Sequence, residues 1–166
     1  MINAPSGWIR PAGAKVSWLA ATSADGPLSY QVVLDGRPQP TPPGAAALRL
    51  GARGLGDGKH QVQVLATDAD GAATLTPPSA LLIDGQPPIV RVRSASRGKG
   101  VIVSVSDAAS GVESRAVGVS FGDGARARGR SVYRHTYARP GVYQIVARVR
   151  DRIGNQATIR RLVSVA

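Results

Sequence analysis

Two segments of the sequence match each other without a gap and decide the fold: GKHQVQVLATDADG (residues 58–71) and GVYQIVARVRDRIG (residues 141–154). Each has a glycine, a ring side chain two positions later, a run of alternating apolar and polar residues, and a closing Asp-x-x-Gly. Alternation with a period of two predicts a β-strand with one buried face. The aspartate can accept hydrogen bonds from the N–H groups of the turn, and the glycine can adopt a positive φ. The two copies therefore predict two similar folds in tandem.

Similar alternating runs occur along the whole chain, separated by clusters of Gly, Pro, Asp and Asn. They predict further strands at residues 15–19, 30–34, 79–84, 89–93, 101–105, 116–121 and 157–165. Asp35-Gly36 is a typical hairpin turn. No ten-residue stretch has helical periodicity, and residues 45–50 come nearest to it. We predict an all-β protein made of two tandem immunoglobulin-like β-sandwiches.

The predicted boundary between the sandwiches is Gly85-Gln86-Pro87-Pro88, which lies between two predicted strands. Two consecutive prolines cannot donate the backbone hydrogen bonds of a central strand, and they favour an extended connector. We therefore predict domains at residues 1–86 and 87–166, joined by a short proline-rich linker.

Three motifs of the second half resemble the polycystic kidney disease (PKD) domain family: VSFGDG (119–124), HTYARPGVY (135–143) and the strand that ends at Asp151. Val119 and Ser120 stand where the family has Trp and Asp. The resemblance implies an immunoglobulin-like sandwich of the kind common on cell surfaces and beside secreted hydrolases. Structural roles are expected for Phe121 in the core, Asp123 in a turn, and His135 inside the core. Tyr143 occupies the tyrosine corner, where the hydroxyl bonds to upstream backbone.

The first half resembles fibronectin type III or related bacterial immunoglobulin-like domains, through Trp18, Tyr30, Asp35-Gly36 and residues 55–60. Trp18 is expected in its core, and His60 stands where a tyrosine corner would be expected.

The residues that catalysis requires are largely missing. The two histidines, His60 and His135, both lie within structural motifs, and no phosphate loop or dinucleotide fingerprint occurs. The chain has no cysteine, so disulfides and thiolate metal sites are excluded. We expect no enzymatic activity and no cofactor. Calcium is the one ion left open, because Asp68 and Asp70 alternate, but calcium takes six to eight oxygen ligands and a solvated turn is favoured. Asp25, Asp57 and Asp84 lie elsewhere in this half.

The net charge of +11 comes entirely from residues 87–166, which hold fifteen basic and four acidic residues. Many of these arginines occur at alternate positions, so those of one strand share a face. They form three sets: Arg91 and Arg93; Arg126, Arg128 and Arg130; and Arg148 and Arg150. If the strands that carry residues 126–130 and 148–150 lie in one sheet, they form a basic face suited to carboxylate, sulfate or phosphate groups. The competing interpretation is a GC-rich coding bias, because arginine outnumbers lysine eighteen to three.

The partners expected are neighbouring domains of a larger protein and an anionic cell-wall polymer or polysaccharide. Nucleic acid is not favoured, since of the seven aromatic residues only Trp8, Tyr133 and Tyr137 are left after the cores are filled.

We hypothesise a structural or adhesive module of an extracellular or cell-surface protein, with its export signal upstream of this chain. Two alternatives remain: an accessory substrate-binding domain of a secreted hydrolase, and a stand-alone polyanion binder. No run of about 18 apolar residues that could span a membrane occurs. A monomer is expected.

Overall fold

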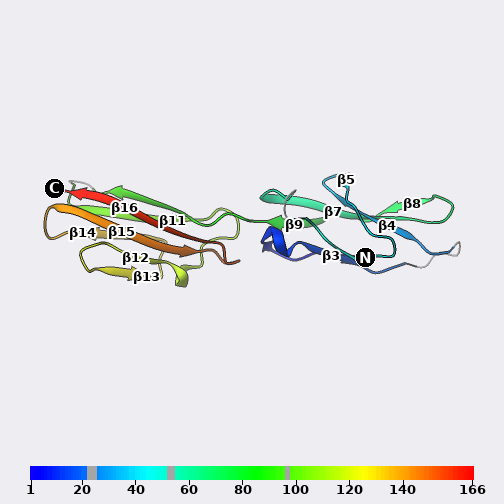
Figure 1. Cartoon of the computed structure of the whole chain (residues 1–166), viewed down its shortest axis with the longest axis horizontal. Helices are drawn as coiled ribbons and strands as arrows, with labels where there is room; N and C mark the ends of the chain where they lie inside the picture. Colours follow the sequence, from blue (N-terminus) through cyan, green and yellow to red (C-terminus); the bar gives the residue numbers. More distant parts are fainter. Residues whose placement is uncertain (22–25, 52–54, 96–97) are drawn as a thin grey trace. The chain divides into compact units, whose positions relative to one another are not determined.

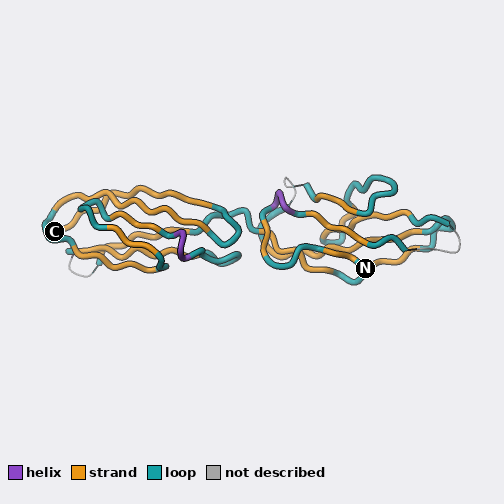
Figure 2. The backbone as a smooth tube through the Cα atoms, turned by 90° about the horizontal axis from the view of Figure 1, so that it is seen from below, coloured by secondary structure: helices purple, strands orange, loops and turns teal. Residues whose placement is uncertain are grey.

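The structure, a computed structural model, describes residues 1–21, 26–51, 55–95 and 98–166. It divides into two compact units, Met1–Gly85 and Gln86–Ala166 (Figure 1). The division falls one residue before the predicted boundary. Strands are the main regular secondary structure of both units, with loops at the strand ends (Figure 2), so the predicted all-β fold class is confirmed.

The first unit contains two sheets. One has the order β1-β3-β6: β1 (Ile2–Asn3), β3 (Lys15–Trp18) and β6 (Ala47–Arg49). The other has the order β2-β9-β7-β4-β5, with β8 paired to β7: β2 (Trp8–Ile9), β4 (Ser29–Leu34), β5 (Arg37–Pro38), β7 (Gly58–Thr67), β8 (Ala73–Leu75) and β9 (Ser79–Ile83). A short 3₁₀ helix, η1 (Pro11–Gly13), precedes β3.

The core of the first unit is filled by the inward residues of these strands. Val16, Val62 and Leu81 are fully buried. Trp18 is 5% exposed, and its ring lies 5.9 Å from that of Tyr30. The strands thus fold as the alternation requires, with one face in the core and the other in water.

The second unit also contains two sheets. The first has the order β10-β11-β14: β10 (Ile89–Ser94), β11 (Gly100–Ser106) and β14 (Val132–Thr136). The second has the order β13-β12-β15-β16: β12 (Gly118–Ser120), β13 (Arg126–Arg128), β15 (Gly141–Arg150) and β16 (Gln156–Val165). The 3₁₀ helix η4 (Ser114–Ala116) leads into β12.

Strand β15 is the centre of this unit, because it pairs with β16 over its whole length and with β12 on its other edge. Its inward residues Ile145, Ala147 and Val149 belong to a single hydrophobic cluster with Val103 and Phe121. The residues between them point to the opposite side of the sheet.

The two repeated segments form the same hairpin turn after β7 and after β15. The Oδ1 atom of Asp68 accepts hydrogen bonds from two backbone N–H groups, at distances of 3.1 and 2.8 Å. Oδ1 of Asp151 accepts from the N–H groups of residues 153–155. Gly71 and Gly154 follow with φ of +88° and +96°. The sequence repeat therefore reproduces a turn that depends on one aspartate and one glycine.

The observed elements differ from the predicted ones at short segments. Residues 116–121 were expected as one strand, but Ala116 belongs to η4 and the strand covers three residues. The segment with the nearest approach to helical periodicity, residues 45–50, contains β6. Strands β5, β8 and β13 have two or three residues each, too few for a period of two to be recognised.

The turn after β12 provides a test of the packing between sheet and loop. Gly122 has φ +89°, and a Cβ there would lie 2.8 Å from the backbone N and O of Gln144. Gly124 has φ +95° and open space around it. We expect Gly124→Ala to lower the free energy of unfolding of the second unit by about 1–2 kcal/mol, the cost of a left-handed conformation. We expect Gly122→Ala to lower it further.

Urea unfolding followed by the near-UV circular dichroism of tyrosine measures this difference, because three of the four tyrosines, Tyr133, Tyr137 and Tyr143, lie in the second unit. Tryptophan fluorescence serves as the internal reference, since both tryptophans belong to the first unit. Equal losses in the two variants would show that Gly122 does not contact Gln144 closely.

Candidate functional site

Five arginines of the second unit lie on the outer face of the sheet β13-β12-β15-β16. Arg126 and Arg128 of β13 pair with Ser120 and Gly118 of β12, which in turn pair with Val146 and Arg148 of β15. Directly paired residues of neighbouring strands point to the same side of a sheet. The inward neighbours Val119, Ala147 and Val149 lie in the core, so these arginines point outward into solvent. The condition for a basic face, that these strands share one sheet, is met.

Two further arginines extend this outer face. Arg150 follows Arg148 at the next outward position of β15. Arg160 of β16 pairs with Val146 and is exposed as well. We call the set Arg126, Arg128, Arg148, Arg150 and Arg160 the basic face.

Arg130 lies outside the basic face, although the sequence grouped it with Arg126 and Arg128. Strand β13 ends at Arg128, and Gly129 has φ +79°, which turns the chain and ends the alternation. The N–H of Arg130 donates to the hydroxyl of Tyr133 at 2.8 Å. Its side chain lines a different recess, together with Arg134.

The four carboxylates of the second unit bind backbone or histidine groups. Asp107 accepts hydrogen bonds from the N–H groups of residues 109 and 111. Glu113 accepts one from the N–H of residue 115, and Asp123 accepts one from the N–H of residue 125. Asp151 holds the hairpin turn and accepts from the side-chain amide of Asn155. The ion pairs His60–Asp35 and His135–Asp123 include no arginine, and within the described residues none of the arginines of the basic face forms an ion pair. The charges of the basic face are therefore available to a ligand.

His135 lies in an aromatic cluster. Its ring stacks on Phe121 with centroids 4.3 Å apart and meets Tyr137 edge-on at 4.7 Å, while Tyr137 stacks on Tyr143 at 4.0 Å. Nε2 of His135 lies 2.6 Å from Oδ2 of Asp123. Burial raises the pKa of Asp123, but the hydrogen bonds from His135 and Ala125 outweigh it and hold that pKa below its ordinary value. This arrangement orients the turn after β12.

Two tyrosines that the sequence left outside the cores are buried. Tyr133 is 6% exposed and Tyr137 is 5% exposed. The hydroxyl of Tyr137 donates to the carbonyl of Phe121 at 2.9 Å. The interpretation that they could remain for base stacking is therefore wrong. Tyr143 forms the tyrosine corner, because its hydroxyl donates to the carbonyl of Arg139, four residues upstream, at 2.8 Å.

In the first unit His60 makes the same bond as a tyrosine corner. Its Nε2 lies 2.8 Å from the carbonyl oxygen of Gly56, also four residues upstream, and its Nδ1 lies 2.6 Å from Oδ2 of Asp35. Both ring nitrogens thus face acceptors, and only the protonated imidazolium carries two N–H donors. The hydrogen bond with Asp35 accordingly raises the pKa of His60.

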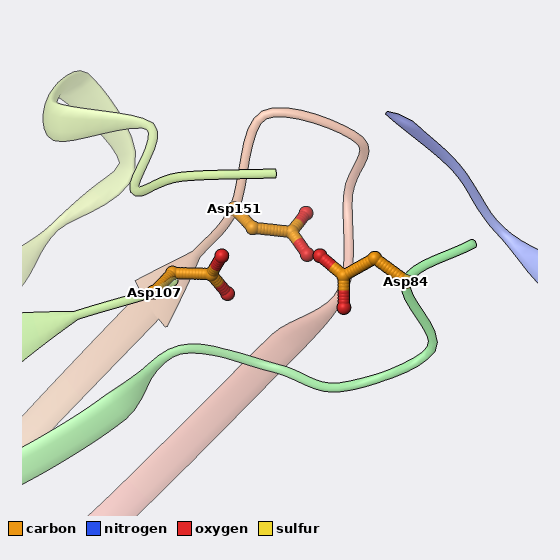
Figure 3. A group of neighbouring side chains, drawn as sticks. All are labelled: Asp84, Asp107 and Asp151. Carbon is orange, nitrogen blue, oxygen red and sulfur yellow. The ribbon is translucent and has the colours of Figure 1, made fainter. Parts of the chain in front are cut away.

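Two of the aspartates considered for calcium, Asp57 and Asp68, accept hydrogen bonds from backbone N–H groups. The Asp68 carboxylate holds its own hairpin turn, and Oδ1 of Asp57 accepts from the N–H of Gly85 at 2.6 Å. Asp25 lies outside the described residues. Asp107 and Asp151 each place one oxygen within 4.8 Å of the other, at the ends of β11 and β15 (Figure 3).

Sequence reasoning missed Gly118, Ser120 and Arg160 as parts of the outer face. The side on which Arg160 or its neighbour Arg161 points is set by the pairing of β16 with β15. Gly118 and Ser120 give no chemical signal by themselves, because their relevance comes from lying between arginines of two other strands.

The free energy of unfolding of the first unit is expected to fall as the pH rises through the raised pKa of His60. Because this pKa lies above its ordinary value of 6.5 in the folded state, the protonated ring stabilises the fold. That contribution is complete below 6.5 and is lost as the pH passes the folded pKa. Urea unfolding followed by tryptophan fluorescence, from about pH 5.5 to about pH 9, measures it.

The matched variant is Asp35→Asn, which keeps an oxygen for the N–H of Gln61 and removes the charge beside His60. Asp35 has φ 49°, a conformation that asparagine tolerates. We expect a flatter pH dependence in this variant. A slope as steep as that of the unchanged chain would contradict the role of the His60–Asp35 pair.

Comparison with known proteins agrees with this architecture. Residues 86–165 match the family model of the PKD domain. No curated protein matches the chain. None of the helices in the described residues is long and apolar enough to cross a membrane.

Among solved structures, the fibronectin(III)-like modules of Clostridium thermocellum CbhA are 16% identical, with a TM-score of 0.43 over 99% of this chain and 94% of that one. SGBP-B of the Bacteroides ovatus mixed-linkage glucan utilization locus, solved with a mixed-linkage heptasaccharide, is 13% identical, with a TM-score of 0.38 over 100% of this chain and 43% of that one. The FN1–FN3 domains of chicken CNTN1 are 12% identical, with a TM-score of 0.37 over 95% and 65%.

PKD and fibronectin type III domains are in general non-catalytic modules of larger proteins. The PKD-like motifs noted in the sequence and the tyrosine corner of Tyr143 fall within the matched segment. Residues 86–165 of this chain are a PKD domain.

Proposed function

We propose that this chain is a non-catalytic module of a larger extracellular or cell-surface protein. In this role the two sandwiches act as a structural and adhesive element, and the basic face attaches the module to an anionic cell-wall polymer or polysaccharide. The chain acts as a monomer, since the repulsion between basic faces opposes self-association.

The observation that carries this proposal is that the register of the strands places like charges on one face of a sheet. Five arginines point outward from one sheet, and the carboxylates of the same unit are engaged elsewhere. Arginine binds carboxylate, sulfate and phosphate through two parallel hydrogen bonds. A coding bias would enrich arginine in the sequence but does not require that five arginines share one face without acidic partners.

Two other functions are less well supported. A reader of single-stranded nucleic acid stacks bases on aromatic rings, and Tyr133, Tyr137 and Phe121 are buried. An accessory domain for a neutral polysaccharide also uses exposed aromatic rings. Strands β15 and β16 contain one aromatic residue, Tyr143, and its ring stacks on Tyr137.

Chromatography of the full chain on immobilised heparin tests the proposal. We expect retention at about 50 mM salt and elution as the salt rises, with the logarithm of the binding constant falling linearly with the logarithm of salt concentration. The matched control is a neutral dextran matrix, on which we expect no retention. Passage through heparin without retention at low salt would refute the proposal, and salt-independent binding to a neutral glucan would favour the hydrolase accessory role.

A further inference from the structure

A groove of about 420 Å³ runs along the outer face of the second sheet of the PKD domain. Its floor is β12, and its sides come from β13, β15 and η4. The residues that matter for its chemistry are Arg115, Gly118, Ser120, Arg126, Arg128 and Arg148.

The groove exists because β12, which forms its floor, has only Gly118 and the small side chain of Ser120 on its outer face. Gly118 lies directly opposite Arg128 on one side and Arg148 on the other. Neighbouring strands are about 4.8 Å apart, so the Cα atoms of these two arginines are separated by about 10 Å. Their guanidinium groups can approach each other over the glycine, where a larger residue would occupy the space.

The arginines reach this space from three directions. Arg126 and Arg128 come from β13, Arg148 comes from β15, and Arg115 comes from η4. The Cγ of Arg128 lies 3.9 Å from where a Cβ of Gly118 would be, so its stem already covers the edge of the floor. Among the described residues that line the groove none is acidic. An anionic group is therefore the ligand that the groove fits.

We propose that the groove is the contact site for a polysaccharide with carboxylate or sulfate groups, one of which binds over Gly118 between Arg128 and Arg148. This inference rests on the proposed function and assigns it to one site. The groove is open to solvent, so a polymer chain can pass through it and continue toward Arg150 and Arg160. The described residues that line it include no aromatic side chain to stack bases, which favours a polysaccharide over single-stranded nucleic acid.

Gly118→Val tests the groove without changing the charge of the protein. A Cβ at this position makes ordinary van der Waals contact with Arg128 alone, and Gly118 has no positive φ, so the variant is expected to fold. We expect its affinity for heparin to fall about tenfold at constant salt, the effect of losing a charge-assisted contact. Far-UV circular dichroism checks that the sandwich is intact.

A pair of double variants separates the groove from general charge. Arg126→Gln with Arg148→Gln removes two charges from the groove, and Arg91→Gln with Arg93→Gln removes two from β10 in the other sheet. We expect the double variant of Arg126 and Arg148 to lose affinity for heparin at least as strongly as Gly118→Val. The double variant of Arg91 and Arg93 should lose only the smaller amount of affinity that follows from its lower net charge.

The outcomes distinguish this inference from the proposed function. If the unchanged chain fails to bind heparin, the proposed function itself fails. If the unchanged chain binds and Gly118→Val binds equally well, or if both double variants lose the same affinity, the polymer contacts the protein elsewhere and only the groove is refuted. Polygalacturonate, which carries carboxylates alone, shows which acidic group is preferred. Tighter binding to duplex DNA than to heparin at the same salt would overturn the assignment to polysaccharide.

Discussion

The pairing of β15 with its two neighbours is the constraint on which the second unit depends. Ile145, Ala147 and Val149 point into the core, and Arg148 and Arg150 point out. A slip of one residue would exchange the two faces, since the side chains of a strand alternate. Full burial of an aliphatic side chain is worth about 1.5–3 kcal/mol, and burial of an unpaired charge is strongly unfavourable. Both terms favour the observed register, and this register also builds the basic face.

The fold can hold these arginines close together because water weakens their repulsion. Two unit charges about 10 Å apart in water repel by about 0.4 kcal/mol. This is small beside the burial of the three aliphatic residues of β15. The same charges would gain much more from an anion held between them, because hydrogen bonds add to the attraction. The core thus tolerates a charge arrangement that an anionic ligand would stabilise.

The repeat, the sandwich class and the family of the second unit could be predicted from the sequence, since each is written in local alternation and turn residues. The position of Gly118 between two arginines could not, because it arises from the pairing of three strands that are distant in sequence. Arg130 was misplaced because Gly129 ends the alternation, and a positive φ is not visible in the sequence. Tyr133 and Tyr137 were misjudged because their burial comes from packing between the sheets.

The most direct test of this account is an NMR titration of the full chain with a short heparin oligosaccharide, following backbone amide and arginine Nε–H signals. We expect the largest shifts at the backbone of Gly118, Ser120 and Arg148, and at the side chains of Arg126 and Arg128. Shifts concentrated on β10 and β14, or spread evenly over all arginines, would contradict it.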